Sequence, residues 1–185
     1  MKGAYMTGLE EAPLGLPSFV RERPEPFQSD SIFGQFVFWR PDKTGNDVLD
    51  HALGRQHFET ALSFARGIHS NTFLAFVLGG ICQAGPGLME SGFIEALSTK
   101  ATYGSLPNMI TDAEAFELFS ATGTTDDEVR FGETEARDYL TLAQETQCPE
   151  VVAALMESIV RCEMRHGSLS FFWTVCGAAY LGGLN

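Results

Sequence analysis

Three side chains in the C-terminal half of the chain have the types and the spacing that hold a metal ion. Two of them, Glu163 and His166, form a Glu-x-x-His pair in a helix expected from Pro149 to about Tyr180. They lie on a stripe of positions spaced alternately by four and three, whose other members are mostly apolar: Val152, Met156, Ile159, Ser170 and Trp173. Because a lone buried carboxylate is costly unless it is paired, protonated or bound to a metal, this pair needs a partner.

The preceding helix, expected at about 126–146, supplies the third side chain. Glu133 lies on an apolar face of that helix, with Val129, Ala136, Leu140 and Ala143. If the two helices form an antiparallel hairpin, Glu133 and Glu163 both lie roughly 22–23 Å from its turn and face each other. A Glu opposite a Glu-x-x-His is half of a di-iron carboxylate site, and these ligand types suit iron or manganese.

A family resemblance rests on the same hairpin. The segment 131–143, the Pro-Glu-Val at 149–151 and the Cys-Glu-Met-Arg-His at 162–166 together resemble one helical hairpin of the rubrerythrin and ferritin-like superfamily. The resemblance implies a ferritin-like helical bundle in which the three side chains bind iron or manganese, with oxidoreductase or metal-handling activity. The chain has no paired C-x-x-C motif. The rubredoxin-like module of classical rubrerythrins is therefore missing, and electron transfer of that type is not expected.

A complete di-metal site needs a second set of ligands, and residues 47–101 contain no second Glu-x-x-His. The nearest candidate ligands there are Glu59 and His57, followed by Glu90. Glu59 shares its face with two arginines, which indicates a solvated surface, whereas the apolar neighbours of His57 indicate burial. Either two chains each contribute one hairpin to a site at a homodimer interface, or the site is mononuclear, degenerate or absent.

The alternative to metal binding is a buried hydrogen-bonded network in which Arg137 or Arg161 neutralises the acids. Glu135 competes with Glu133 for the inward position, but its level across the hairpin is nearer Val160. Under this alternative the chain is a non-enzymatic helical interaction protein that forms a homodimer. Nucleophilic catalysis has little support, because no Gly-x-Ser-x-Gly is present and no cysteine has an identifiable base apart from the adjacent pair Cys162 and His166.

The elements that must position these side chains are helices, so the expected fold class is all-α. Caps and breaks delimit the segments: Thr44-Gly-Asn before the first, Ala-Gly-Pro-Gly at 84–87, and Gly-Thr-Thr before the helix at 126. The expected helices span about 47–68, 72–83, 88–101, 111–121, 126–146 and 149–180.

Residues 1–45 differ from the remainder, the helical domain at 46–185. Five of the eight prolines fall in this first segment and prevent a long helix. Within it, residues 31–39 alternate roughly and carry four large aromatic side chains that need a surface to cover, either on the domain or on a second subunit. We therefore expect an extended, proline-rich aromatic arm.

Composition restricts the partners. The chain has 185 residues, enough for one compact domain, and a formal net charge of -12. Such an acidic surface repels phosphate, so neither nucleic acid nor an anionic membrane is an expected partner. The longest apolar run, 169–184, is short for a bilayer span and is interpreted as a buried helix end. The four cysteines have no metal or redox spacing, and no secretion signal is visible, so we expect reduced thiols and a cytoplasmic location.

Overall fold

The computed structural model describes residues 15–23, 35–107, 119, 123–161 and 168–182, and helices make up most of them. A two-stranded antiparallel sheet pairs Arg21 with Val37 and Glu22 with Phe36. The elements are β1 (Arg21–Glu22), β2 (Phe36–Val37), α3 (Asp47–Gly67), α4 (Thr72–Ala84), α5 (Leu88–Thr102), α7 (Asp126–Thr146), α8 (Glu150–Arg161) and α9 (Ser168–Leu181). The all-α prediction is confirmed. The helix predicted at 111–121 lies outside the described residues, Phe119 excepted.

Local capping explains why two of these helices start where they do. The side chain of Asn46 accepts hydrogen bonds from the backbone N–H groups of Val48 and Leu49, both at 3.1 Å, at the start of α3. A reciprocal capping box between Thr125 and Glu128 starts α7. These starts agree with the sequence prediction because each cap depends only on residues within one turn.

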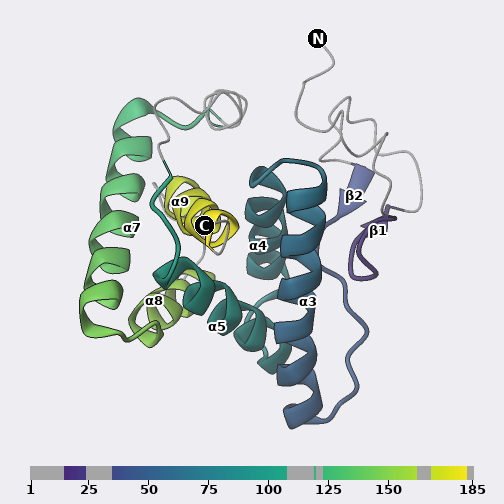
Figure 1. Cartoon of the computed structure of the whole chain (residues 1–185). Helices are drawn as coiled ribbons and strands as arrows, with labels where there is room; N and C mark the ends of the chain where they lie inside the picture. The colour runs from purple at the N-terminus through teal and green to yellow at the C-terminus, as the bar shows by residue number, and fades with distance from the viewer. Residues whose placement is uncertain (1–14, 24–34, 108–118, 120–122, 162–167, 183–185) are drawn as a thin grey trace.

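α9 forms the centre of the molecule. All residues from 170 to 179 are buried, and α9 packs against α4, α5 and α7, as Figure 1 shows. A helix that is apolar on every side must be surrounded by protein, which confirms the interpretation of this run as a buried helix. Its last carbonyl groups accept hydrogen bonds from Arg66 of α3, including one from the guanidinium to Tyr180 O at 2.8 Å. None of the described helices is both long and apolar enough to cross a membrane.

The prediction of one long helix from residue 149 to residue 180 is wrong. The structure has two helices there, α8 and α9, on either side of residues 162–167, which lie outside the described part. A single straight helix over this range would be about 48 Å long, against about 32 Å for its hairpin partner α7. The sequence also changes character, since α8 buries one face whereas α9 is buried all round. The two halves of the predicted stripe therefore belong to two separate helices of the described chain.

The described parts of the N-terminal segment cover the helices of the same chain. We call residues 35–46 the strap. Its Phe38 and Trp39 are 8% and 3% exposed. The ring of Trp39 lies 5.2 Å from that of Phe93 on α5, and Phe38 lies 5.2 Å from Phe76 on α4. These strap aromatics therefore pack against helices of their own domain, and their burial does not require a second subunit.

α3 and α5 touch backbone to backbone where Gly54 of α3 passes Met89 and Gly92 of α5 passes His51. A Cβ atom added at Gly54 would lie 1.9 Å from the carbonyl oxygen of Met89, and one at Gly92 would lie 2.1 Å from that of His51. Only glycine permits this approach. From this crossing the two helices diverge, as Figure 1 shows.

Candidate functional site

Glu133 is held by an arginine of its own helix. Its side chain is 15% exposed, and its Oε1 accepts hydrogen bonds from Nε of Arg137 at 2.9 Å and from the terminal guanidinium at 2.8 Å. Arg137 also donates to the carbonyl oxygen of Pro107 at 2.6 Å. The charge of Glu133 is therefore compensated, as the alternative to metal binding requires. The other arginine considered for this role, Arg161, instead pairs with Glu157 at 3.2 Å.

The two remaining members of the predicted metal site, Glu163 and His166, lie outside the described residues, as does Cys162. On either side of them four of the predicted inward positions are buried, Val152 and Met156 in α8 and Ser170 and Trp173 in α9, and Ile159 is half-buried. Each half of the stripe faces the core, although the two halves belong to different helices.

The structure does not bring Glu59 and His57 together with Glu133. Glu59 is exposed and lines a groove between α3 and α5. His57 points to the other side of α3, where its ring centroid lies 5.0 Å from Phe19 and 5.8 Å from Trp39. Burial against these rings lowers the pKa of His57 below its ordinary value. Among the residues that the structure describes, no three His, Cys, Asp or Glu side chains are grouped closely enough to hold a metal ion.

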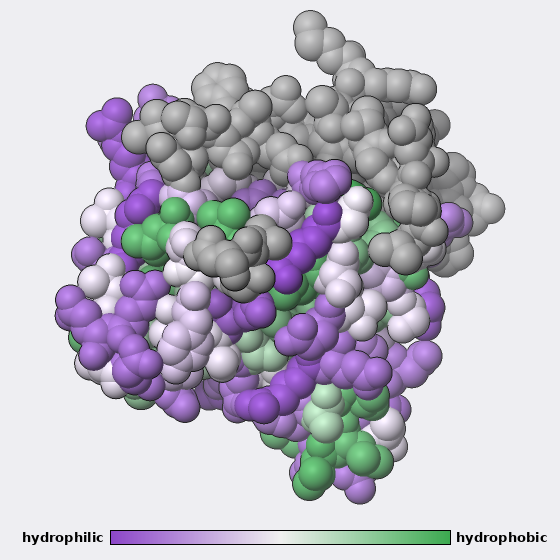
Figure 2. Space-filling model, viewed as in Figure 1, coloured by the Kyte–Doolittle hydropathy of each residue, from purple (hydrophilic) through white to green (hydrophobic). Residues whose placement is uncertain are grey.

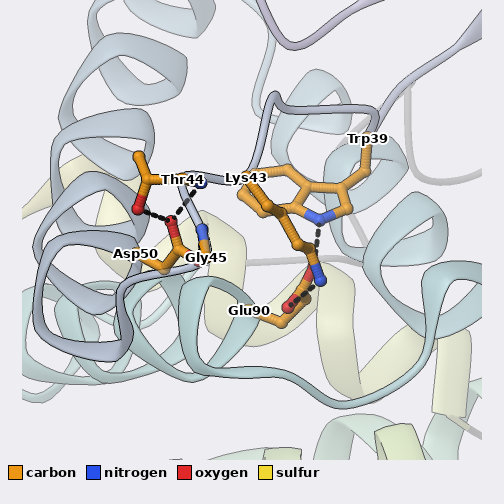
Figure 3. Close-up of polar contacts among 6 residues, drawn as sticks. All are labelled: Trp39, Lys43, Thr44, Gly45, Asp50 and Glu90. Atoms are coloured by element: carbon orange, nitrogen blue, oxygen red, sulfur yellow. Dashed lines mark hydrogen bonds and ion pairs between the residues drawn. The ribbon is translucent and has the colours of Figure 1, made fainter.

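Glu90 is the most completely buried acid of the described chain. It is 1% exposed and occupies the first turn of α5. Its carboxylate accepts a hydrogen bond from the indole N–H of Trp39 at 3.0 Å and pairs with Nζ of Lys43 at 3.0 Å (Figure 3). The positive end of the helix dipole stabilises a negative charge at this position. Glu90 therefore fastens the strap to α5.

Asp50 fastens the other end of the same strap. Its carboxylate accepts hydrogen bonds from the backbone N–H and the hydroxyl of Thr44, at 2.8 and 2.7 Å, and from the N–H of Gly45 at 3.3 Å (Figure 3). The backbone bond from Thr44 lowers the pKa of Asp50 most, followed by its hydroxyl bond. Gly45 has a φ of +76°, a conformation in which glycine carries no penalty.

The described cysteines are poor nucleophiles. Cys82, Cys148 and Cys176 are free thiols. Burial raises the pKa of Cys82 to about 11 and also raises that of Cys176. The thiol of Cys148 donates to the carboxylate of Glu150 at 3.1 Å, which raises its pKa. Because the thiolate is the reactive form, the raised pKa of each of these three thiols favours the less reactive protonated form.

The sequence pattern indicated Glu90 only as a candidate metal ligand, ranked after Glu59 and His57, and did not predict its partners. A glutamate three residues after a helix-starting glycine was the available signal, but Trp39 and Lys43 lie 51 and 47 positions away. Comparison with protein-family models, with characterised proteins and with solved structures finds no match to this chain.

Proposed function

We propose that the chain is a non-enzymatic helical interaction protein that pairs with a second copy of itself through the end of the molecule where α3 and α5 begin. The observation that carries this proposal is a group of exposed apolar side chains, which we call the apolar end: Val48 and Leu49 in the first turn of α3, and Leu88 at the start of α5. These side chains are 78%, 54% and 44% exposed. Apolar groups gathered at one place on a surface are typical of interaction sites.

The two helix starts lie near each other because the strap ties them together. Lys43 pairs with Glu90 in the first turn of α5, and its neighbour Thr44 bonds to Asp50 in the first turn of α3. Figure 2 shows apolar surface gathered at the lower end of the molecule, where α3 starts in Figure 1. The three apolar side chains thus belong to one end of one domain.

A second copy fits this end better than a strongly charged partner does. In a twofold symmetric interface the same patch meets itself, so its charged rim must hold both signs. The nearby side chains do so: Arg55, 56% exposed, and Glu95, 39% exposed, form an ion pair at 2.9 Å, and Lys43 is 53% exposed. The buried or largely buried acids Asp50, Glu90 and Glu133 are each held by structural partners, which supports an interaction role over catalysis.

A charge placed in the apolar end tests the proposal. In Leu49→Glu the new carboxylate would occupy the third position of α3, where it favours the helix, so folding is retained while the patch gains a charge. Phe131→Glu is the matched control, because Phe131 is also exposed, at 58%, and lies on α7. By sedimentation velocity we expect a wild-type dimer, a dimeric control and a monomeric Leu49→Glu variant. A monomeric wild type, or a dimeric Leu49→Glu variant, would contradict the proposal.

A ferritin-like iron or manganese site is a second candidate function, supported by the inward, largely buried position of Glu133 on α7. It would use Glu133, Glu163 and His166, with oxidoreductase or metal-handling activity. Elemental analysis of full-length protein purified without chelator tests it against a Glu163→Ala/His166→Ala variant. Iron or manganese in the wild type alone would support the site, and negligible metal in both proteins would remove it.

A further inference from the structure

The groove between the diverging parts of α3 and α5 has the size of a small-molecule site. Its volume is about 570 Å³, and its lining includes Gln56 and Glu59 from α3, Ala96 and Lys100 from α5, Tyr103 and Gly182. Binding sites for small ligands commonly have volumes of about 300–1,000 Å³. The groove is thus larger than a single ion needs. It adjoins the apolar end proposed above as the dimer contact, because Arg55 belongs both to the groove lining and to the charged rim of that end.

Two opposite charges line this groove without meeting each other. Neither the carboxylate of Glu59 nor the ammonium group of Lys100 has a hydrogen-bond or ion-pair partner in the described part of the chain, although both side chains line the same space. The third charged side chain of the lining, Arg55, is held by Glu95 at 2.9 Å. The groove therefore offers a carboxylate that can bind a cationic group and an ammonium group that can bind an anionic group.

We propose that this groove binds a small zwitterion, an amino acid or dipeptide whose ammonium group contacts Glu59 and whose carboxylate contacts Lys100. Lysine donates up to three hydrogen bonds, and an ionised carboxylate accepts several, so each charge of the ligand meets the complementary type. The methyl group of Ala96 and the ring of Tyr103, which is 59% exposed, provide apolar surface for a ligand side chain.

The charge of the whole chain favours a zwitterion over a singly charged ligand. A net charge of -12 repels anions at long range, so Lys100 alone does not make this a good site for a simple anion. A simple cation would be attracted by Glu59 but repelled by Lys100 and Arg55. A ligand with both charges is neutral overall, avoids the long-range penalty and uses both side chains.

Isothermal titration calorimetry with full-length protein and the dipeptide glycyl-phenylalanine tests this inference. Two analogues separate the contributions: the C-terminal amide lacks the carboxylate, and the N-acetyl derivative lacks the ammonium group. We expect each analogue to bind at least about tenfold more weakly than the dipeptide, since a charge-assisted contact is lost.

Variants of the two side chains assign the contacts. We expect Lys100→Gln to weaken the dipeptide about tenfold and to leave the amide unchanged, because the amide has no carboxylate to lose. Glu59→Gln is expected to weaken the dipeptide similarly and to leave the N-acetyl derivative unchanged. Glu145→Gln, an exposed acid on α7, is the control and should bind the dipeptide as the wild type does.

Three results would overturn the inference: no binding of the dipeptide at millimolar concentration, analogues that bind as tightly as the dipeptide, or variants without effect. Circular dichroism of each variant checks that it is folded. Both substitutions lie on exposed or partly exposed helix surfaces, so we expect an unchanged spectrum. Sedimentation of the same variants should show an unchanged oligomeric state, which separates failure here from failure of the proposed dimer.

Discussion

Trp39 donates its indole N–H to the carboxylate of Glu90 at 3.0 Å, across 51 positions of the chain. Trp39 is 3% exposed and Glu90 is 1% exposed, so this bond lies inside the protein, where water cannot replace either partner. Lys43 supplies the compensating charge from the protein surface, with its side chain 53% exposed. One buried acid therefore determines where the strap crosses α5.

The contact between the strap and Glu90 predicts an order of stabilities. Lys43→Met keeps the aliphatic stem but leaves a buried carboxylate without a cation, and should lower the free energy of unfolding by about 3 kcal/mol. Trp39→Phe keeps a ring but removes the N–H, and should cost ~1–3 kcal/mol. Urea unfolding measures both.

The control for this series is Arg161→Met, which breaks the exposed pair with Glu157. Exposed ion pairs contribute ~0–1 kcal/mol, so this variant should unfold near the wild-type midpoint. If Lys43→Met were no more destabilising than Arg161→Met, the burial of Glu90 would not govern the strength of the strap contact.

Two glycine substitutions, one at the close crossing of α3 and α5 and one away from it on α4, should have opposite effects on stability. In Gly54→Ala the new methyl group would lie 1.9 Å from the carbonyl oxygen of Met89, so the helices must separate. Overpacking of this kind costs ~1–3 kcal/mol or more. Gly79→Ala on α4 meets nothing within 4 Å and should stabilise its helix by ~0.5–1 kcal/mol. Thermal unfolding of both variants measures the difference, and equal melting temperatures would contradict the described crossing.

The sequence predicted what short-range chemistry determines. Asn46 caps α3 and Thr125 caps α7 through bonds within one helical turn. The local order of residues was therefore enough to predict where these helices start. Arg137 lies one turn from Glu133 and was recognised as its possible partner for the same reason. The buried character of 170–179 was predicted from an apolar run that is interrupted by Ser170 and Thr174 and is too short to span a bilayer.

Long-range relationships escaped prediction because no periodicity encodes them. The described chain has two helices, α8 and α9, where a single periodic stripe predicted one, because helical spacing alone does not mark where one helix ends and the next begins. The burial of His57 was predicted from its own helix, yet two of its ring neighbours, Phe19 and Trp39, come from the N-terminal segment. The groove beside Glu59 exists because α3 and α5 cross at glycines and then diverge. The sequence predicted only that Glu59 lies on a solvated surface, because helical spacing carries no information about the angle between two helices.

His57 predicts a loss of stability in mildly acidic solution. Burial lowers its pKa in the folded protein, so the unfolded chain binds the proton more readily. The contribution of neutral His57 to the free energy of unfolding is therefore fully present above the unfolded pKa of about 6.5 and is lost as the pH falls below it. In His57→Phe, which keeps an aromatic ring against Phe19 and Trp39, this part of the pH dependence should disappear. Urea midpoints at pH 7.5 and pH 5 measure it.

The partially buried His51, which contacts Glu95 at 3.2 Å, provides the comparison for His57. His51→Phe removes an imidazole from the same helix but leaves His57 in place, so the decrease in stability below pH 6.5 should persist. An equal pH dependence in the wild type and His57→Phe would show that burial of His57 is not its cause.

Arg137 decides whether the carboxylate of Glu133 is a structural group or a latent ligand. Arg137→Met would leave Glu133 and the carbonyl oxygen of Pro107 without their donor, at a cost of ~1–3 kcal/mol in unfolding free energy. We expect added Mn²⁺ not to restore this loss, because among the described residues no group of three His, Cys, Asp or Glu side chains that could hold a metal ion surrounds Glu133. Arg137→Met/Glu133→Met removes both charges and should recover part of the stability, as replacement of a buried pair by apolar groups commonly does. Restoration of the single variant by Mn²⁺, absent in the double variant, would instead identify Glu133 as a metal ligand and favour the ferritin-like function.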